Sequence, residues 1–287
     1  MATVKHFVLT KFNLKKKEWG KDKSGDTTLG DEWMKERWQL FENYCLPSMR
    51  AQTCTNYTWL LLLDAHTAPV YKQRLEQLRK ELPRLTPCYF DERQMSNAIE
   101  HVVELIKSMT GDEEYIMTTN LDNDDALHRD MLGGLQAKLN ETDKTGLYTY
   151  VNGLQYIEHK RLLLRMRYPH NHFLTLVEKS DDEIKTIISY GHGKARKRVS
   201  NTVDLQGPPR WLEVVHGHNV SNDLRITSRI AYRPVVRPFS FAEYGIALKL
   251  SFRDNLSGML FRMPPYFVST AGWRVKRKID KKRDKRQ

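Results

Sequence analysis

The apolar run YTWLLLLD at residues 57–64 constrains the fold of this chain more than any other feature. It has the length of a strand, and its lack of polar alternation is typical of a strand that is buried on both faces. Such strands occur mainly in parallel sheets that carry helices on each side. The run therefore predicts an α/β fold built around a mainly parallel central sheet.

The first half of the chain alternates between the periods of strand and helix. Strands are predicted at residues 6–12, 57–64, 85–90 and 114–121. Apolar residues at helical spacing predict four helices, through Met34, Trp38, Phe41 and Cys45; Leu75, Leu78 and Leu82; Ile99, Val102, Val103 and Ile106; and Leu132, Leu135 and Leu139. Repeated strand–helix units predict a parallel sheet that helices cover on both faces.

The second half of the chain is less regular. Two further strands are predicted at residues 146–157 and 161–168, and shorter segments follow at 172–178, 186–191 and 211–220. No internal repeat and no linker interrupts the chain before its end. We therefore expect one α/β domain over residues 1–270 and a basic, disordered tail over residues 271–287.

The net charge of +12 is concentrated in that tail. Residues 274–287 hold nine Lys or Arg against two Asp, a net charge of +7, so the rest of the chain carries +5. Basic tails are usually solvated, although one can contact an anionic membrane. A nucleic-acid-binding protein is the alternative, with KARKR at residues 194–198 as a second basic segment. Stacking aromatic residues are not interleaved with these positions, which makes nucleic-acid binding the weaker interpretation.

The sequence also indicates a compartment. No apolar segment approaches the roughly 20 residues that span a membrane, and the N-terminus lacks the layout of a signal peptide. The cysteines Cys45, Cys54 and Cys88 are odd in number and far apart, so their spacing fits neither a zinc site nor a disulfide framework. We expect a cytoplasmic protein, with peripheral membrane contact only through the tail.

Residues 118–127, TTNLDNDDAL, place three aspartates and an asparagine in consecutive positions after a predicted strand. Ligands of open α/β sheets bind at the carboxyl ends of strands. Adjacent carboxylates repel unless a cation or hydrogen-bond donors offset their charge, and Mg2+ and Mn2+ prefer carboxylate oxygen. Asp122 and Asp124 form an Asp-x-Asp pair suited to a metal that also binds a diphosphate. The alternative is a polar turn in which Asp125 caps the next helix.

Six segments occur in the order HFVLTKFNL, LFENYCLPSMRAQT, WLLLLDAHT, LDNDDALHRDML, HFLTLVE and VVHGHNVSN. Together they resemble the bacterial and viral family of putative rhamnosyltransferases, which are glycosyltransferases with a GT-A-like domain. The resemblance runs from about residue 5 to residue 225. It implies a nucleotide-binding half at about residues 1–130 and an acceptor half at about residues 131–270.

The resemblance also implies an activity. It implies a metal-dependent enzyme of polysaccharide biosynthesis that transfers a sugar, L-rhamnose, to a glycan or lipid-linked acceptor. The donor would be dTDP- or UDP-rhamnose, and the cofactor Mn2+ or Mg2+. Nucleotidyl or phosphoryl transfer is a further alternative, because it would use the same paired aspartates and metal. The missing GxxxxGK[ST] motif counts against its P-loop forms.

In GT-A enzymes the Asp-x-Asp element binds the cation and the donor's diphosphate, and often its ribose. The resemblance therefore implies Asp122 at the ribose or the metal, Asp124 at the metal, Asp125 as a further metal ligand, and His216 as the late histidine that completes the metal shell. It further implies that Asn219 contacts a phosphate or orients the histidine.

The first strand of a GT-A domain ends at the nucleotide, which implies donor contacts for Thr10, Phe12 and Asn13. Asp64 ends the second predicted strand at the same edge and is assigned a similar role. A core position for Phe12 and a turn position for Asn13 are the alternatives.

Two roles remain, at the phosphates and at the acceptor. Arg93 and Arg129 are candidates for phosphate contact, because a guanidinium suits oxyanions, with a surface position as the alternative. An inverting transferase needs a base for the acceptor hydroxyl. Glu178, which ends the segment HFLTLVE, is the candidate base, and a surface glutamate that closes a strand is the alternative.

Overall fold

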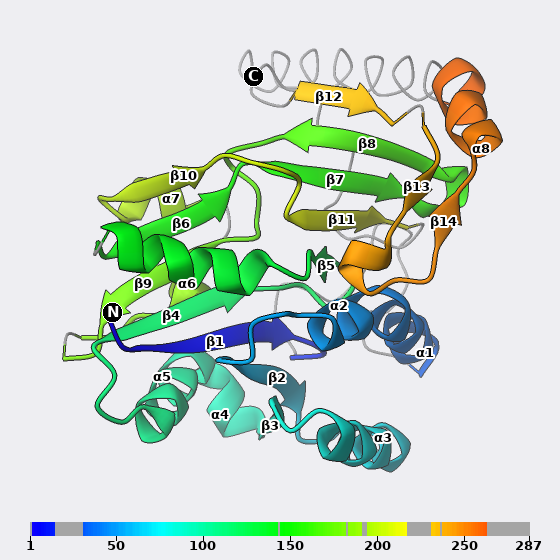
Figure 1. The fold of residues 1–287 in the computed structure, drawn as a ribbon. Helices are drawn as coiled ribbons and strands as arrows, with labels where there is room; N and C mark the ends of the chain where they lie inside the picture. The colour runs from blue at the N-terminus through cyan, green and yellow to red at the C-terminus, as the bar shows by residue number, and fades with distance from the viewer. Residues whose placement is uncertain are drawn as a thin grey trace, which may run out of the picture.

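The computed structural model describes residues 2–14, 31–142, 144–181, 183–190, 194–216, 231–235 and 237–262. Two sheets dominate this part of the chain (Figure 1). The larger has seven strands in the order β10-β6-β9-β4-β1-β2-β3. Their bounds are β1 Val4–Lys11, β2 Thr58–Asp64, β3 Leu85–Phe90, β4 Tyr115–Asn120, β6 Gly146–Tyr150, β9 Thr175–Lys179 and β10 Thr202–Leu205.

This sheet is mainly parallel, as predicted. Strands β1 to β4 run parallel to one another, and β9 is antiparallel to both β4 and β6. The apolar run explains the arrangement, because residues 59–63 of β2 are completely buried. A strand with no exposed face needs cover on both sides of its sheet.

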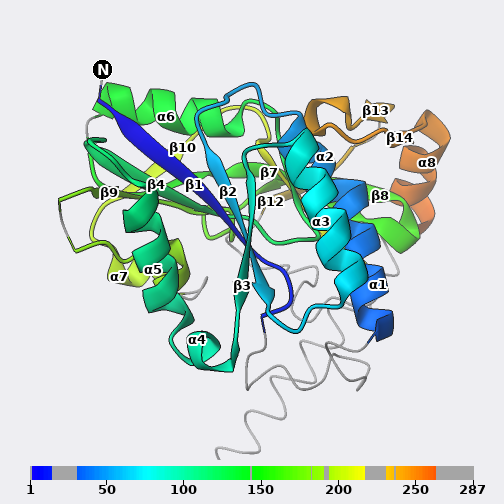
Figure 2. The same cartoon turned by 90° about the horizontal axis from the view of Figure 1, so that it is seen from below.

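Helices supply that cover on both faces, which confirms the predicted α/β class (Figure 2). One face packs against α1 Asp31–Leu40, the π-helical turn η1 Phe41–Cys45, α2 Leu46–Arg50, α3 Pro69–Glu81 and α6 Met131–Thr142. The other packs against α4 Glu92–Ser96, α5 Ala98–Met109, the 3-10 turn η3 Ile187–Ser189 and α7 Ala195–Arg198. Successive residues of β1 alternate between these two cores, with Val8 in the first and Phe7 and Leu9 in the second.

The second sheet has five strands in the order β12-β8-β7-β11-β5. Their bounds are β5 Ala126–Leu127, β7 Asn152–Ile157, β8 Leu162–Arg167, β11 Trp211–Val215 and β12 Ala231–Pro234. The remaining elements are η2 Glu158–Lys160, β13 Phe239–Ser240, η4 Ala242–Tyr244, β14 Lys249–Leu250, α8 Phe252–Ser257 and η5 Gly258–Arg262. This sheet is mostly antiparallel, although β11 runs parallel to β7.

Two of the chain crossings between the sheets bear on the site, and the sequence does not predict them. Residues 146–157, expected as one strand, form β6 in the first sheet and β7 in the second, with Val151 between them. The acidic segment makes the other crossing, from β4 to β5. The predicted basic tail at residues 271–287 lies outside the described residues.

Two further expectations can be compared with the structure. Among the described residues, no helix combines the length and the apolar character that crossing a membrane requires. The cysteines Cys45, Cys54 and Cys88 are all free thiols. This agrees with the expectation that they form no disulfide framework.

Candidate active site

The acidic segment lies where the two sheets meet. Residues 122–125 follow β4, and β5 then pairs with β11 of the second sheet. The turn is therefore at the carboxyl edge of the parallel strands, where ligands of such sheets bind. Cys45, at the end of η1, is close to it: burial and, after it, the charges of Asp125, Asp124 and Asp122 raise the pKa of this thiol.

Two of the aspartates converge with a histidine from the segment before β9. Asp122, Asp125 and His172 each offer one ligand atom, and these three atoms lie within 4.8 Å of one another. His172 Nε2 is 2.6 Å from Asp125 Oδ2 and 3.9 Å from Asp122 Oδ2. Carboxylates and imidazole together suit a divalent cation such as Mn2+. The donor set of this cluster, the Asp122–Asp125–His172 group, therefore fits the predicted metal.

Asp125 is the buried anchor of this group. Its side chain has no exposed surface. Oδ2 contacts His172, and Oδ1 accepts the backbone N–H of Val214 in β11 at 2.8 Å. Asp125 thus links the acidic turn to both sheets. It does not cap α6, which begins at Met131, so the predicted alternative of a helix cap is wrong.

Burial and pairing act in opposite directions on Asp125 and His172. Burial raises the pKa of Asp125, and the hydrogen bond from His172 opposes that shift. Burial lowers the pKa of His172, but the hydrogen bond and the charge of Asp125 outweigh it and raise that pKa. The Asp125 carboxylate also accepts the Val214 amide, which favours its ionised form. The raised pKa of His172 is therefore the dominant effect: without a cation an imidazolium offsets the buried carboxylate, and a bound cation would take the place of that proton.

Asp124 has different partners. Its Oδ2 accepts a hydrogen bond from Arg37 Nη1 of α1 at 2.6 Å and lies 3.0 Å from His216 Nε2. Burial by itself would raise the pKa of Asp124, but the charge of Arg37 and the contact with His216 hold it below its usual range. Arg37 also donates to Asn123 Oδ1 at 3.3 Å. Arg37 therefore supplies the positive charge that allows Asp124 to lie buried in an acidic turn.

The structure divides the predicted metal ligands into two sets. Asp122 and Asp125 meet in the metal-capable group, whereas Asp124 and His216 pair with each other. His216 follows β11 and reaches the acidic turn, as the sequence indicated, and the contact it makes there is with Asp124. The predicted phosphate contact Asn219 lies outside the described residues.

Two of the predicted donor contacts lie inside the fold. Thr10 is fully buried, and its hydroxyl accepts a hydrogen bond from Trp59 Nε1 at 2.9 Å. The ring of Phe12 is buried and packs against Trp38 and Phe41. This packing contradicts a donor contact by either side chain and agrees with the core alternative for Phe12.

Asn13 and Asp64 tie the ends of β1 and β2 together at the predicted edge. Asn13 Oδ1 accepts the backbone N–H of Asp64 at 3.1 Å, and its Nδ2 donates to Thr67 Oγ1 at 3.0 Å. Asp64 Oδ1 in turn accepts the backbone N–H of His66 at 2.7 Å. Both side chains therefore order the start of the loop after β2. Arg93 is exposed on α4, which follows the end of β3.

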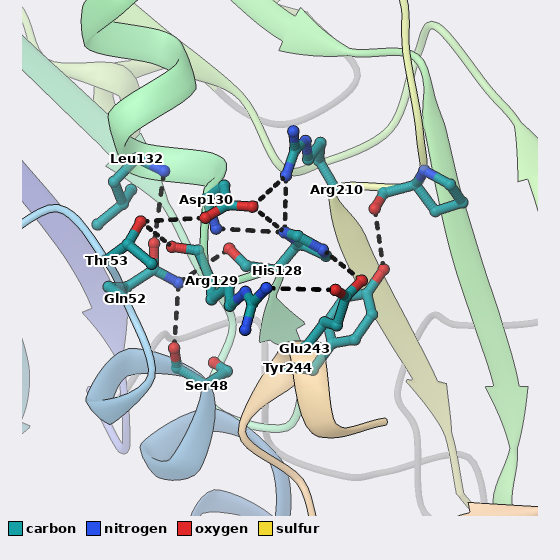
Figure 3. A network of polar contacts seen from close by, with 11 residues as sticks. Ser48, Gln52, Thr53, His128, Arg129, Asp130, Leu132, Arg210, Glu243 and Tyr244 are labelled. Carbon is teal, nitrogen blue, oxygen red and sulfur yellow. Dashed lines mark hydrogen bonds and ion pairs between the residues drawn. The ribbon is translucent and has the colours of Figure 1, made fainter. Parts of the chain in front are cut away.

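Arg129 belongs to a polar network between β5 and α6 (Figure 3). Its guanidinium lies 3.5 Å from Glu243 of η4. His128 is at the centre, with Nε2 3.0 Å from Glu243 Oε2 and Nδ1 2.8 Å from Arg210 Nη1. Arg210 also donates to Asp130 Oδ2 at 3.1 Å. The network joins the start of α6 to β11 and η4. Arg129 therefore helps to hold these three elements together.

Glu178 lies near the start of β4, whereas the acidic turn follows the end of that strand. Because β9 is antiparallel to β4, its register pairs Glu178 with Ile116, six positions before Asp122. At about 3.3 Å per residue, these positions are roughly 20 Å apart. The Glu178 carboxylate accepts the backbone N–H groups of Lys185 and Thr186, at 2.8 and 3.0 Å. This placement contradicts the predicted role of Glu178 as the base, which must reach the acceptor hydroxyl.

Two residues of the site, His172 and Arg37, are not predicted from the sequence. His172 opens HFLTLVE, one of the six segments that carry the resemblance, so a signal was present but pointed to the other end of that segment. Arg37 lies in the helix DEWMKERWQL, where nothing distinguishes it from the neighbouring Lys35. Its contact with Asp124 joins positions 87 residues apart, which no local pattern reveals.

Known proteins resemble this chain at the level of a family and of solved structures. The family described as putative rhamnosyl transferase matches residues 11–228. No curated protein matches. Residues 1–349 of S. aureus TarS are 10% identical over 73% of this chain and 60% of that one, with a TM-score of 0.43.

Two other solved structures show similar values. The complex of TarS 1–349 with UDP is 11% identical over 74% of this chain and 60% of that one, with a TM-score of 0.42. A putative nucleotide-diphospho-sugar transferase from Desulfovibrio desulfuricans G20 is 9% identical over 73% of this chain and 82% of that one, with a TM-score of 0.35. The chain spans 60% of the length of the TarS 1–349 structures that it matches.

Proposed function

We propose that this chain, which belongs to the putative rhamnosyl transferase family and is a glycosyltransferase, transfers L-rhamnose from a nucleoside-diphosphate donor with the help of a divalent cation. The acceptor is a hydroxyl of a glycan or of a lipid-linked saccharide. The observation that carries the proposal is the Asp122–Asp125–His172 group at the carboxyl edge of the sheet. The family accounts for sugar transfer, and this group offers the ligands for the cation.

The chemistry explains why a cation belongs there. Mn2+ or Mg2+ would neutralise the charge that develops on the departing nucleoside diphosphate. Asp125 is held by His172 and by the Val214 amide, so its carboxylate is ordered before any ligand binds. The side chain of Asp122 is 38% exposed, which lets it meet a ligand that arrives from solvent. The positive charge of Arg37 is not proposed to contact the donor, because it already neutralises Asp124 of the acidic turn.

The donor is proposed to be dTDP- or UDP-rhamnose. Asn13 and Asp64 are proposed to lie near its nucleoside, because they stand at the ends of β1 and β2 on the edge that carries the acidic turn. Asn219 remains a proposed phosphate contact. Arg129, whose side chain is 49% exposed, would have to leave Glu243 to take that role.

A panel of donors tests the proposal. The protein is incubated with dTDP-L-rhamnose, UDP-L-rhamnose, UDP-glucose or UDP-N-acetylglucosamine, in Mn2+, Mg2+ or EDTA, and the release of nucleoside diphosphate is measured. We expect release from a rhamnose donor that EDTA abolishes. Asp122→Asn should lower the rate by roughly 100-fold or more, because Lewis-acid help to the leaving group is worth several kcal/mol.

The matched control is Asp112→Asn, an exposed aspartate in the loop before β4, and its rate should equal that of the wild type. Release of nucleoside monophosphate and pyrophosphate would instead indicate nucleotidyl transfer and would overturn the proposal. So would a full rate for Asp122→Asn in EDTA.

Metal binding can be measured without any donor. Titration with Mn2+, followed by its electron paramagnetic resonance signal, should show one site in the wild type. His172→Gln should weaken that site by at least about 10-fold, which is typical of lost ligand support. His101→Gln, a histidine of α5 paired with Glu104, is the control and should bind as the wild type does. Equal binding by all three proteins would remove His172 from the site.

A further inference from the structure

A hollow of about 150 Å³ opens beside the acidic turn. It is lined by Glu36, Gln39, Leu40, Asn43, Glu158 and His216. The first four come from α1 and η1, whereas Glu158 and His216 follow the parallel strands β7 and β11 of the second sheet. Pockets for drug-sized ligands measure roughly 300 to 1,000 Å³, so this hollow has room for a single ring.

The hollow adjoins the acidic turn through two elements. His216, in its wall, lies 3.0 Å from Asp124 Oδ2. Helix α1 supplies Glu36 to the hollow and the next residue, Arg37, to Asp124. A group bound in the hollow would therefore be one side chain away from the carboxylates at the end of β4.

The lining favours an uncharged ligand rich in hydroxyl groups. The carboxylates of Glu36 and Glu158 accept hydrogen bonds, and the amides of Gln39 and Asn43 both donate and accept. Hydroxyl groups can satisfy both kinds of partner. No lysine or arginine is among the six lining residues, so a phosphate group here would meet two carboxylates and be repelled. The hollow is thus unsuited to the diphosphate of a donor.

Glu158 is ordered before a ligand arrives. The hydroxyl of Tyr44, a residue that is largely buried, donates a hydrogen bond to Glu158 Oε1 at 2.6 Å. A carboxylate that is already fixed loses less side-chain entropy when it accepts a ligand hydroxyl. Leu40 adds an apolar surface, against which the C–H groups of a ring can pack.

We propose that this hollow is a saccharide subsite that binds one pyranose ring next to the acidic turn. The inference rests on the proposed function and deepens it, because it names where a sugar ring is held. The ring belongs either to the acceptor or to the donor sugar, since both present the same hydroxyl chemistry.

Saturation-transfer NMR on the full chain tests the subsite without metal and without catalysis. The probes are methyl α-L-rhamnoside and methyl β-D-glucoside, with phenyl phosphate as an anionic ring for contrast. We expect saturation of the protons of at least one glycoside and none of phenyl phosphate. Asn43→Trp, which fills the hollow from the exposed side of η1, should abolish the signal. Glu158→Gln should weaken binding by roughly 10-fold, because a neutral amide replaces a charged acceptor.

Asn140→Trp is the matched control, because Asn140 is an exposed asparagine of α6, and it should bind as the wild type does. Asp122→Asn should also bind the glycoside, so a failed metal site and a failed subsite give different results. Absence of glycoside saturation, or equal saturation in Asn43→Trp and the wild type, would overturn the proposal.

Competition identifies the source of the ring, and either result supports the subsite. Displacement of the glycoside by dTDP-L-rhamnose but not by dTDP assigns the hollow to the donor sugar. Retention of the glycoside in the presence of dTDP-L-rhamnose and Mn2+ assigns it to the acceptor.

Discussion

The segment between β4 and α6 has two charged halves that differ in how their charges are neutralised. In the first half, residues 122–125, two of the three aspartates are buried and meet partners from α1, β11 and the segment before β9. In the second half, residues 128–130, Asp130 is 42% exposed and lies in a network of ion pairs with Arg210 and His128. One short stretch of sequence thus forms two different kinds of structure.

The difference shows what distinguishes a candidate metal site from a network of ion pairs that only stabilises the fold. Around residues 128–130 the acids Asp130 and Glu243 meet Arg129 and Arg210, and His128 lies between them, so the charges balance (Figure 3). Around residues 122–125 three carboxylates meet one arginine and two histidines, and two of these carboxylates are buried, where repulsion is strong. The first half therefore has a use for a cation, whereas the second is complete without one.

The largest effect should come from replacing one aspartate in each half. Asp125→Asn removes a buried carboxylate that pairs with His172, so we expect activity to fall by roughly 1,000-fold and stability by about 3 kcal/mol. Asp130→Asn should keep activity within about 3-fold, because an exposed ion pair is worth less than about 1 kcal/mol. Nucleoside diphosphate release and urea unfolding measure both quantities. Equal losses in the two variants would end the distinction between the halves.

The next largest effect should be a loss of stability when Arg37, whose positive charge neutralises Asp124, is replaced. Arg37→Met should destabilise the protein by about 3 kcal/mol, because it removes the guanidinium that neutralises the buried Asp124 and leaves only the contact with His216 among those described above. Adding Asp124→Asn should recover at least about 1 kcal/mol of that loss. The exposed pair Lys138 and Glu141 is the control, and its coupling should stay below about 0.5 kcal/mol. Urea unfolding of both double-mutant cycles decides the matter, and additive effects at Arg37 and Asp124 would contradict the pairing.

A smaller effect is expected at Glu178, which lies in neither half. Glu178→Gln should destabilise the protein by about 1 kcal/mol, because a neutral amide accepts the Lys185 and Thr186 amides less strongly than a carboxylate does. Its transferase rate should stay within about 3-fold of the wild type. A rate loss of roughly 100-fold in a folded Glu178→Gln variant would restore Glu178 as the base and refute its structural role.

The smallest expected effect is the pH dependence of the stability that Asp130, in the second half, contributes. Burial by itself would raise the pKa of Asp130, but hydrogen bonds from Arg210 and Thr53 lower it. A carboxyl group with a lowered folded pKa contributes stability above its unfolded pKa of about 3.9 and loses it as the pH falls through the folded value. Asp130→Asn should therefore be less stable than the wild type at pH 7, by less than about 1 kcal/mol, and equally stable near pH 2. A difference that grows in acid would contradict this sign.

The class of fold was predictable because its signals are local. The apolar run in β2 and the alternation of strand and helix periods indicated a helix-covered parallel sheet, and both depend on residues close together in the sequence. The edge that carries the site was predictable too, because parallel strands end at the same side of a sheet. The second sheet was missed because its strands are short and β6 continues almost directly into β7.

The composition of the site was only partly predictable. The sequence by itself determined that several carboxylates follow β4 and that the chain belongs with sugar transferases. Only the tertiary structure decided that Asp125 meets His172 while Asp124 meets Arg37, since those pairs are 47 and 87 residues apart. It likewise placed Glu178 far from the acidic turn, because β9 runs antiparallel to β4. Local patterns establish which groups a chain carries, whereas the pairing and direction of its strands establish which of those groups meet.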